Sequence, residues 1–510
     1  MHTTIRIPDD VSEADLQKAL GAQLSLGPAR SVRLTFLDSF DWILSADGAR
    51  LWRESSGGRH QLCWVERPAE PTYSVPIQGD VRWAADLPQG HLRSRIAPHL
   101  GIRALTEVGG CRIQRRRGGV RDGDGNNTLL VDLDRAELLG PSGSTVTVIR
   151  LVGVPGLERP FKKAVRKLTA LGGDAGETAD LLELATAAQG RFIGDYSSKL
   201  RLSIKPDQPS DEALRNILLT LLKTLRANVA GTIADIDTEF LHDLRVASRR
   251  TRSALTQVKG VLPAEDIAPF MTEFKWLGTV TGPCRDLDVL LMEMEEYHDE
   301  LPELADALKP LLRTIQDARE EAYREVCAGL RSRRFASLVT DWEAYVASET
   351  PPDRRPDNAG VPIRETASGR ILKAYRRTLK RGGNLGDNPP AEALHQLRID
   401  AKKLRYLLEF FRNLYPKKEI DRLVRELKAL QDVLGGLNDM EVQQDRLLGF
   451  ARDLSSAPED HAATLIAMGR LSAIMADRQE AYRLEFAERF EVFAHPKSQD
   501  RYRSLFGSGA

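Results

Sequence analysis

The chain has 510 residues, and its 73 lysines and arginines are balanced by 73 aspartates and glutamates, so the formal net charge is zero. This length predicts two or three domains, whereas a generic nucleic-acid binder would usually be basic overall. The four cysteines have neither metal-like nor paired spacing, which indicates reduced thiols and not a disulfide framework. No apolar run approaches the roughly 20 residues that span a bilayer, and the N-terminus lacks the shape of a signal peptide. We therefore expect a soluble cytoplasmic protein that does not bind membranes.

The first third of the chain is rich in short β-like stretches separated by Gly-rich turns. Stretches predicted as strands are residues 3–7, 31–36, 48–54, 60–66, 110–116, 128–132 and 145–152, and residues 12–24 and 158–171 have helical spacing. Short strands at regular spacing predict an antiparallel sheet or barrel. Residues 122–127 share part of the carboxylate pattern of a calcium loop but lack its final bidentate Glu, so a hairpin turn is expected there.

From about residue 208 the chain is predicted to be a succession of helices. Helical apolar spacing covers residues 211–230, 239–261, 264–280, 286–300 and 303–329, and, beyond a Pro-rich linker at 351–357, residues 363–380, 391–415, 419–434, 439–454 and 461–493. The expected fold class is α+β with several domains. A β-rich, barrel-like or tunnel-like domain would occupy residues 1–200, and an all-α domain would occupy residues 208–500, with halves at 208–350 and 361–500.

One pattern of cations occurs twice in the helical part. Residues 242–252 are H-D-L-R-V-A-S-R-R-T-R, and residues 395–405 are H-Q-L-R-I-D-A-K-K-L-R. In both copies the His is followed by a cation three, seven, eight and ten residues later. The copies are 153 residues apart, and the same offset relates Lys275 to Lys428. An internal repeat of this kind predicts a duplicated helical unit, and we expect two bundles related by a pseudo-twofold axis.

The spacing of the pattern places its cations on one side of a helix. At about 100° per residue, positions 0, 3, 7 and 10 fall within an arc of roughly 80°. Like charges one turn apart repel by a few tenths of a kcal/mol per pair, so the stripe does not stabilise the fold. Two explanations stay open. Acidic neighbours on adjacent helices neutralise the stripe, although each window holds only one acid, Asp243 or Asp400, or a polyanionic ligand binds to it.

The doubled H-x-x-R-x-x-x-[RK]-[RK]-x-R motif, with R-D-L-D-V at 285–289 and N-D-M-E-V at 438–442, resembles the CHAD family, the conserved histidine α-helical domain. The resemblance implies two helical bundles with pseudo-twofold symmetry, binding of inorganic polyphosphate, and association with polyphosphate granules. The binding residues that it implies are His242, Arg245, Arg249, Arg250, Arg252, Lys275, His395, Arg398, Lys402, Lys403, Arg405 and Lys428, with Lys223 and Arg376 as further candidates. Asp286 and Asp439 are expected to cap a helix or to orient a cation.

The N-terminal part is similar to a diverged CYTH domain, the triphosphate tunnel fold. Active CYTH enzymes open with E-x-E-x-K, whose carboxylates hold the metal, but residues 3–7 here are T-T-I-R-I. This difference argues against triphosphatase chemistry. Six arginines are candidates for lining a tunnel, and the alternative is that they are exposed strand residues: Arg33, Arg50, Arg53, Arg112, Arg115 and Arg117.

The predicted function is a non-catalytic, polyphosphate-binding protein that docks on granules and has no metal or other cofactor. Neither His has a second ligand at i+3 or i+4, which argues against a metal. Each His would donate to phosphate, so that binding strengthens at mildly acidic pH, or would instead orient the helix start through a backbone carbonyl or an Asp. The alternatives are a CYTH-type triphosphatase and a general polyanion or nucleic-acid scaffold. Only Tyr406 adjoins the stripes, so the stacking residues of single-strand binders are missing.

Overall fold

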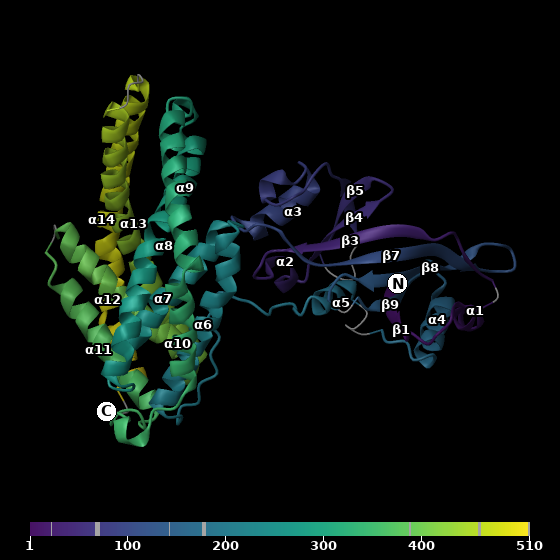
Figure 1. Ribbon diagram of the computed structural model, residues 1–510, viewed down its shortest axis with the longest axis horizontal. Helices are drawn as coiled ribbons and strands as arrows, with labels where there is room; N and C mark the ends of the chain where they lie inside the picture. The colour runs from purple at the N-terminus through teal and green to yellow at the C-terminus, as the bar shows by residue number, and fades with distance from the viewer. Residues whose placement is uncertain are drawn as a thin grey trace. The chain divides into compact units, whose positions relative to one another are not determined.

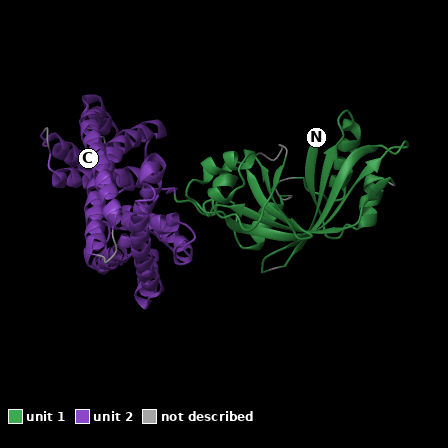
Figure 2. Ribbon diagram, turned by 90° about the horizontal axis from the view of Figure 1, so that it is seen from above, with its two compact units in different colours: residues 1–198 green, residues 199–510 purple. Residues whose placement is uncertain are grey.

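The computed structural model describes residues 1–21, 23–66, 72–141, 143–175, 180–386, 389–456 and 461–507. The chain divides into two compact units, unit 1 at residues 1–198 and unit 2 at residues 199–510 (Figures 1 and 2). No helix in the described part of the chain is long and apolar enough to cross a membrane.

Unit 1 is built on one antiparallel sheet. Its strands are β1 (His2–Ile7), β2 (Leu24–Leu26), β3 (Arg30–Asp38), β4 (Arg50–Ser56), β5 (Arg59–Val65), β6 (Tyr73–Pro76), β7 (Thr106–Arg121), β8 (Asn127–Leu138) and β9 (Thr145–Gly153). The strand order is β1-β9-β8-β7-β3-β4-β5-β6, and β2 pairs with β7. The antiparallel sheet is therefore confirmed, but the barrel alternative is wrong, because no pairing among the described strands joins β1 to β6.

Five helices accompany the sheet of unit 1 within the described residues. They are α1 (Glu13–Leu20), α2 (Ile43–Ala46), α3 (His91–Leu100), α4 (Glu158–Ala170) and α5 (Leu181–Ala188), with a 3-10 turn η1 (Ala84–Asp86). Helices α1 and α4 cover one face of the sheet, where apolar residues such as Ile5, Leu151 and Leu168 are buried together. The turn at 122–127 joins β7 to β8 as predicted, and Asp122 Oδ1 accepts hydrogen bonds from the N–H groups of Asp124 and Asn126.

Unit 2 is all helical. Its helices are α6 (Ser210–Ile233), α7 (Thr238–Gln257), α8 (Ala264–Glu300), α9 (Lys309–Arg331), α10 (Arg333–Ala347), α11 (Ile363–Gly383), α12 (Ala391–Phe410), α13 (Lys417–Ser456), α14 (Ala462–Ala494) and α15 (Pro496–Phe506), with 3-10 turns η3 (Pro302–Leu304), η4 (Pro352–Arg354) and η5 (Arg412–Leu414). The starts of α6, α7 and α8 each lie 153 residues before those of α11, α12 and α13. The duplication seen in the sequence is thus a duplication of helices.

The two halves of unit 2 exchange equivalent backbone bonds. The N–H of Ser210 donates to the carbonyl of Val361 at 3.0 Å, and the N–H of Ile363 donates to the carbonyl of Gln208 at 2.8 Å. These residues form two pairs at the repeat offset of 153. Reciprocal contacts of this kind are what a twofold relation between the halves requires. One apolar core contains residues of both halves, among them Leu244 and Leu397.

Two predicted helix breaks are wrong. Helices α8 and α13 run through residues 281–285 and 435–438, where Gly-containing loops were expected. Gly436 is required by packing, since a Cβ on it would lie 2.4 Å from the ring of Tyr482 on α14. Helices α8 and α9, and likewise α13 and α14, form long antiparallel pairs that project from the bundle (Figure 1) and share an apolar core.

Candidate functional site

The two predicted stripes lie on α7 and α12, which pack against each other. Helix α7 begins at Asp237, whose side chain accepts hydrogen bonds from the N–H groups of Glu239 and Phe240. Apolar residues between the cations, such as Leu244 and Leu404, are fully buried. The cations themselves are half-buried or exposed, so the amphipathic spacing expected from the sequence is present.

Of the remaining candidates, Lys275 and Lys428 are exposed on α8 and α13, the helices that follow the stripes. Lys223 and Arg376 are exposed on α6 and α11. The structure records no contact that joins Lys223 or Arg376 to the cations of α7 and α12.

Cations from the two halves lie close enough to affect each other. Burial and the positive charges of Arg398 and Arg249 together lower the pKa of Lys402 to about 8, against an opposing effect of Asp439. Arg249 and Lys402 are equivalent residues at the repeat offset, so the two stripes meet where the halves adjoin. We call the cations of α7 and α12, together with Lys275 and Lys428, the basic surface.

One carboxylate lies within the basic surface. Glu409 on α12 accepts a hydrogen bond from Nη2 of Arg250 at 2.7 Å, and its Oε1 lies 3.2 Å from Nε of Arg405. Glu409 lies outside both predicted windows, although it follows Arg405 at the i+4 spacing typical of helical ion pairs. The acid inside the second window does not neutralise the stripe, because Asp400 is buried and paired with Arg377 and Arg381 on α11.

The first cation of each stripe is held differently in the two halves. In the first half, Arg245 donates to the carbonyl of Gly278 at 3.1 Å and to Oγ1 of Thr281 at 3.0 Å. Burial lowers the pKa of Arg245, and the charge of Arg249 contributes to the same effect. In the second half, Arg398 donates to Asp439 at 3.0 Å.

The two aspartates beyond the stripes orient cations, in agreement with one of the two expectations for them. Asp439 binds Arg398, and Asp286 binds Arg446 on α13 at 2.7 Å. The helix-capping alternative is wrong, because both aspartates lie inside continuous helices.

The second His has a defined partner. Nδ1 of His395 lies 2.7 Å from Oδ1 of Asn438, and the side-chain amide of Asn438 donates to Asp439 at 3.4 Å. A backbone carbonyl or an Asp was expected as the partner of this His, and the structure shows the side-chain amide of an Asn instead. The ring's Nε2 is left as its other hydrogen-bonding atom. His242 lies half-buried on α7 at the equivalent position.

A pocket of about 310 Å³ lies between α7 and α8 in the first half. Four of its lining residues are cations of the basic surface. The lining residues are Arg245, Ser248, Arg249, Arg252, Lys275, Gly278, Thr279 and Thr281. The pocket is thus a recess in the basic surface, and none of the described residues that line it is a carboxylate.

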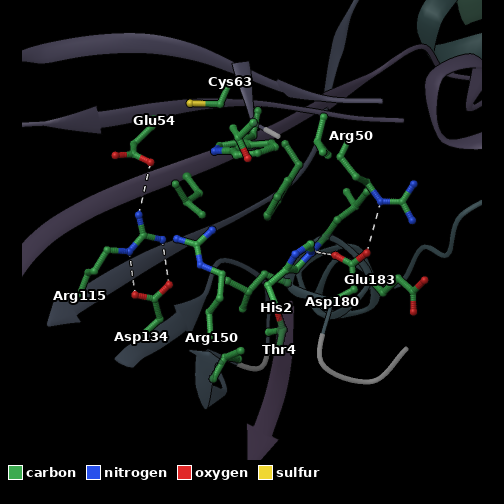
Figure 3. A pocket seen from close by; sticks show the side chains of 18 of the residues that line it. His2, Thr4, Arg50, Glu54, Cys63, Arg115, Asp134, Arg150, Asp180 and Glu183 are labelled. Atoms are coloured by element: carbon green, nitrogen blue, oxygen red, sulfur yellow. Dashed lines mark hydrogen bonds and ion pairs between the residues drawn. The ribbon is translucent and has the colours of Figure 1, made fainter. Parts of the chain in front are cut away.

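Unit 1 has a larger cavity of about 910 Å³, lined from β1 across the curved sheet to β6 and by α5 (Figure 3). Several of its charged groups form ion pairs. Arg115 forms a two-pronged ion pair with Asp134, both bonds being 2.8 Å long, and reaches Glu54 at 3.5 Å. Arg50 lies 3.3 Å from Asp180. Hydrogen bonding to Asp134 and the charges of both acids raise the pKa of Arg115 in spite of its burial, so it stays charged.

The six arginines proposed for a tunnel divide between the two faces of the sheet. Arg50, Arg115 and Arg117 line the cavity. Because successive side chains of a strand point to opposite faces of the sheet, the other three lie at small pockets on the opposite face: Arg33, Arg53 and Arg112.

The metal site of the tunnel enzymes does not fit the residues of this cavity. The first strand contributes His2, Thr3 and Thr4 to the lining, and no carboxylate. In the described part of the chain, no three His, Cys, Asp or Glu side chains are grouped so that they could hold a metal ion.

Comparison with known proteins agrees with this organisation. The family model of the CHAD domain matches residues 216–448. Two curated, uncharacterized proteins from two Mycobacterium tuberculosis strains are each 30% identical over 271 residues, which are 50% of this chain and 48% of theirs. This chain therefore matches about half the length of those relatives.

Two solved structures are similar to parts of this chain. The crystal structure of the CHAD domain from the plant Ricinus communis is 29% identical, with a TM-score of 0.48, and covers 57% of this chain and 95% of that chain. The crystal structure of an inorganic triphosphatase is 14% identical, with a TM-score of 0.17, and covers 32% of this chain and 80% of that chain. The stretch that matches the family model of the CHAD domain lies within unit 2 and contains both cation stripes.

Proposed function

We propose that this protein binds inorganic polyphosphate at the basic surface without cleaving it, and that this binding docks the protein on polyphosphate granules. The observation that carries the proposal is the meeting of the two stripes where the halves adjoin. Arg249 and Lys402 come from different halves, yet the charge of Arg249 lowers the pKa of Lys402. Gathering like charges in this way costs folding free energy, and a bound polyanion would offset that cost.

The chemistry of the surface suits a phosphate chain. Polyphosphate carries a negative charge on every unit, so its recognition needs a row of donors and no sequence readout. Arg offers a planar fork that bonds two phosphate oxygens at once, and Lys adds a mobile point charge. The helices α7 and α12 supply both residue types. Binding should release counterions and therefore weaken steeply with salt.

Single-stranded nucleic acid suits the surface less well. Proteins that bind it place aromatic rings where bases can stack. Tyr406, the one aromatic residue that adjoins the stripes in the sequence, is 7% exposed, and the guanidinium of Arg405 lies 5.9 Å from its ring centre. This ring is therefore closed to a base, which favours polyphosphate over the general polyanion scaffold. Displacement of polyphosphate by RNA at equal total charge would support the scaffold instead.

The proposal is tested by binding of long-chain polyphosphate across a salt series. The test variant removes four cations of the basic surface, Arg245→Ala, Arg249→Ala, Arg398→Ala and Lys402→Ala together. The control variant removes four exposed cations elsewhere, Lys309→Ala, Arg470→Ala, Arg489→Ala and Arg503→Ala, so that both variants change the net charge equally. The test variant should bind more weakly, with a salt slope shallower by roughly one for each phosphate that it no longer neutralises. Equal binding by the two variants would refute the proposed site.

Docking on granules is tested with the same variants. Particles of polyphosphate condensed with Mg²⁺ should retain the wild type and the control variant on sedimentation, and should lose the test variant. Retention of all three proteins would show that the basic surface does not mediate docking.

A further inference from the structure

The two halves differ at the pocket between α7 and α8. Its volume of about 310 Å³ is at the lower end of the range for small-molecule sites, roughly 300–1,000 Å³. Of its lining residues, Ser248 and Thr281 are buried, whereas Arg249, Lys275 and Thr279 are exposed. Helices α7 and α8 pack against each other, so the pocket is a recess between the two helices.

The pocket is lined by four cations, and no carboxylate is among its described lining residues. Nε of Arg252 is buried and has no hydrogen-bond partner among the described residues, and the same holds for Nε of the equivalent Arg405 in the second half. Arg405 forms an ion pair with Glu409 at 3.2 Å, whereas Thr256 takes the position of that Glu in the first half. No carboxylate therefore follows Arg252 at the helical spacing that pairs Arg405.

The second half fills the corresponding place with its own side chains. At the repeat offset, Gly278 is replaced by Gln431, Thr279 by Asp432 and Thr281 by Leu434. Gln431 and Leu434 are buried, and Asp432 adds an exposed negative charge. The recess of the first half therefore depends on Gly278, which leaves the space that a glutamine occupies in the second.

We infer that this pocket takes the terminal phosphate group of a linear polyphosphate, so that the first half holds a chain end and the second half holds interior units. This inference rests on the proposed function, polyphosphate binding, and adds that the protein recognises the end of the polyphosphate chain. A terminal phosphate is joined to the chain on one side only, so it needs one exit from the recess, whereas an interior unit needs two. A terminal phosphate also carries a second ionisable oxygen, as a phosphate monoester does, which suits a recess lined by four cations.

A single substitution tests the pocket without changing any charge. Gly278→Gln copies the residue of the second half. A Cβ at Gly278 would lie 3.8 Å from Nη1 of Arg252, an ordinary contact, so the side chain can be added without moving the backbone. Gln is also a better helix former than Gly, so the variant should fold. Gly469→Gln on α14 is the matched control, because Gly469 is exposed on a helix with open space around it.

The experiment compares two probes, linear triphosphate and a cyclic metaphosphate of equal or greater total charge, which has no terminal group. Wild type and Gly469→Gln should bind the linear form at least about tenfold more tightly than the cyclic form. Gly278→Gln should lose this preference and still bind long-chain polyphosphate. In competition at equal concentrations of phosphate units, short linear chains should displace long ones from the wild type more effectively than from Gly278→Gln.

The outcomes separate this inference from the proposed function. If wild type binds long-chain polyphosphate but shows no preference for the linear probe, or if Gly278→Gln keeps the preference, recognition of the end is refuted and polyphosphate binding stands. If wild type binds linear triphosphate but no long chain, the proposed function fails and the pocket remains an oxyanion site. Binding of neither probe nor the long chain overturns both.

Discussion

Glu409 on α12 accepts a hydrogen bond from Arg250 on α7 at 2.7 Å, and its other oxygen lies 3.2 Å from Nε of Arg405. A carboxylate of the second half therefore holds one cation from each half. The three side chains are 16% to 28% exposed, so solvent screens the contact only in part. Glu409 joins the two halves, and it also competes with a bound anion for both guanidinium groups.

Glu409→Gln should lower the stability of the fold and at the same time raise the affinity for polyphosphate. Losing the charge-assisted bonds should reduce the free energy of unfolding by on the order of 2 kcal/mol. Freeing two guanidinium groups from a carboxylate should strengthen polyphosphate binding. Urea unfolding and binding titrations measure the two effects. Glu392→Gln is the control, since Glu392 is exposed on the same helix and accepts a bond from Gln396. Weaker binding by Glu409→Gln would show that Glu409 positions the cations more than it competes for them.

The pKa of Lys402 predicts how stability and binding depend on pH. Burial, with Arg398 and Arg249, lowers this pKa to about 8 from 10.5. Between those values the unfolded chain binds more protons than the folded protein, so the contribution of Lys402 to stability rises with pH in that window. Below about pH 8, Lys402 is charged in both the folded and the unfolded state, so its whole unfavourable contribution to the free energy of unfolding is present. A bound polyanion favours the charged form, so affinity should fall as pH rises through about 8.

Lys402→Met should therefore raise the free energy of unfolding at pH 7 by roughly 1–3 kcal/mol while weakening polyphosphate binding. Lys402→Arg provides the matched control, because Arg keeps its charge and its binding should not fall between pH 7 and pH 9. Chemical denaturation and binding titrations at these pH values give both readouts. A wild-type affinity that stays constant across this range, or a destabilised Lys402→Met, would contradict the prediction.

His395 should contribute to polyphosphate binding through its second ring nitrogen. Its Nδ1 lies 2.7 Å from Oδ1 of Asn438, an arrangement in which Nδ1–H donates to the amide oxygen. This bond fixes the orientation of the ring and leaves Nε2 for the anion. His395→Gln should therefore weaken polyphosphate binding, whereas His298→Gln, which changes an exposed His, should leave it unchanged. Equal binding by His395→Gln and the wild type would show that this ring does not contact the anion.

The repeated motif was sufficient to predict where the cations lie, because helical spacing links residue number to helix face. It could not predict the partners that hold them. Glu409 lies outside the motif window, and Asn438 becomes a partner of His395 only through the packing of α12 against α13. The approach of Arg249 to Lys402 across the halves depends on the packing of α7 against α12, and no spacing within one helix could establish it.

The errors in the fold have a common cause, which is that tertiary packing overrides local signals. Helix breaks were predicted at residues 281–285 and 435–438, yet α8 and α13 are continuous there. Helices α10 and α15 were missed after the long helices, although Trp342 and Tyr502 anchor them in the core. In unit 1, the strands were predicted from their spacing, but β2 and β6 were missed, and spacing does not specify whether a sheet closes.

The adjacent residues Gly435 and Gly436 allow this packing to be tested. A Cβ on Gly436 would lie 2.4 Å from the ring of Tyr482, whereas a Cβ on Gly435 would meet nothing within 4 Å. Gly436→Ala should therefore destabilise the protein by about 1–3 kcal/mol through overpacking. Gly435→Ala should stabilise it by up to about 1 kcal/mol, because Ala is the better helix former. Thermal and urea unfolding would check both signs, and equal effects of the two substitutions would argue against close packing at Gly436.

The cavity of unit 1 leads to a prediction about the second candidate function, a metal-dependent triphosphatase. The cavity carboxylates of Glu54 and Asp134 are engaged by Arg115, and the strand β1 contributes no carboxylate to the described lining. We therefore expect the full chain to release no phosphate from linear triphosphate with Mg²⁺ or Mn²⁺.

A positive result would have to be traced to this cavity. Release that needs the metal and disappears in Glu54→Gln, with helicity and polyphosphate binding unchanged, would establish the enzyme. Arg115→Gln distinguishes a structural role from a catalytic one. Removing one partner of this largely buried ion pair should cost about 3–5 kcal/mol in stability. Because the carboxylates already bind Arg115 and not a metal, that loss should be the same with and without Mg²⁺. A stability loss that Mg²⁺ reverses would instead reveal a latent metal site beneath the guanidinium.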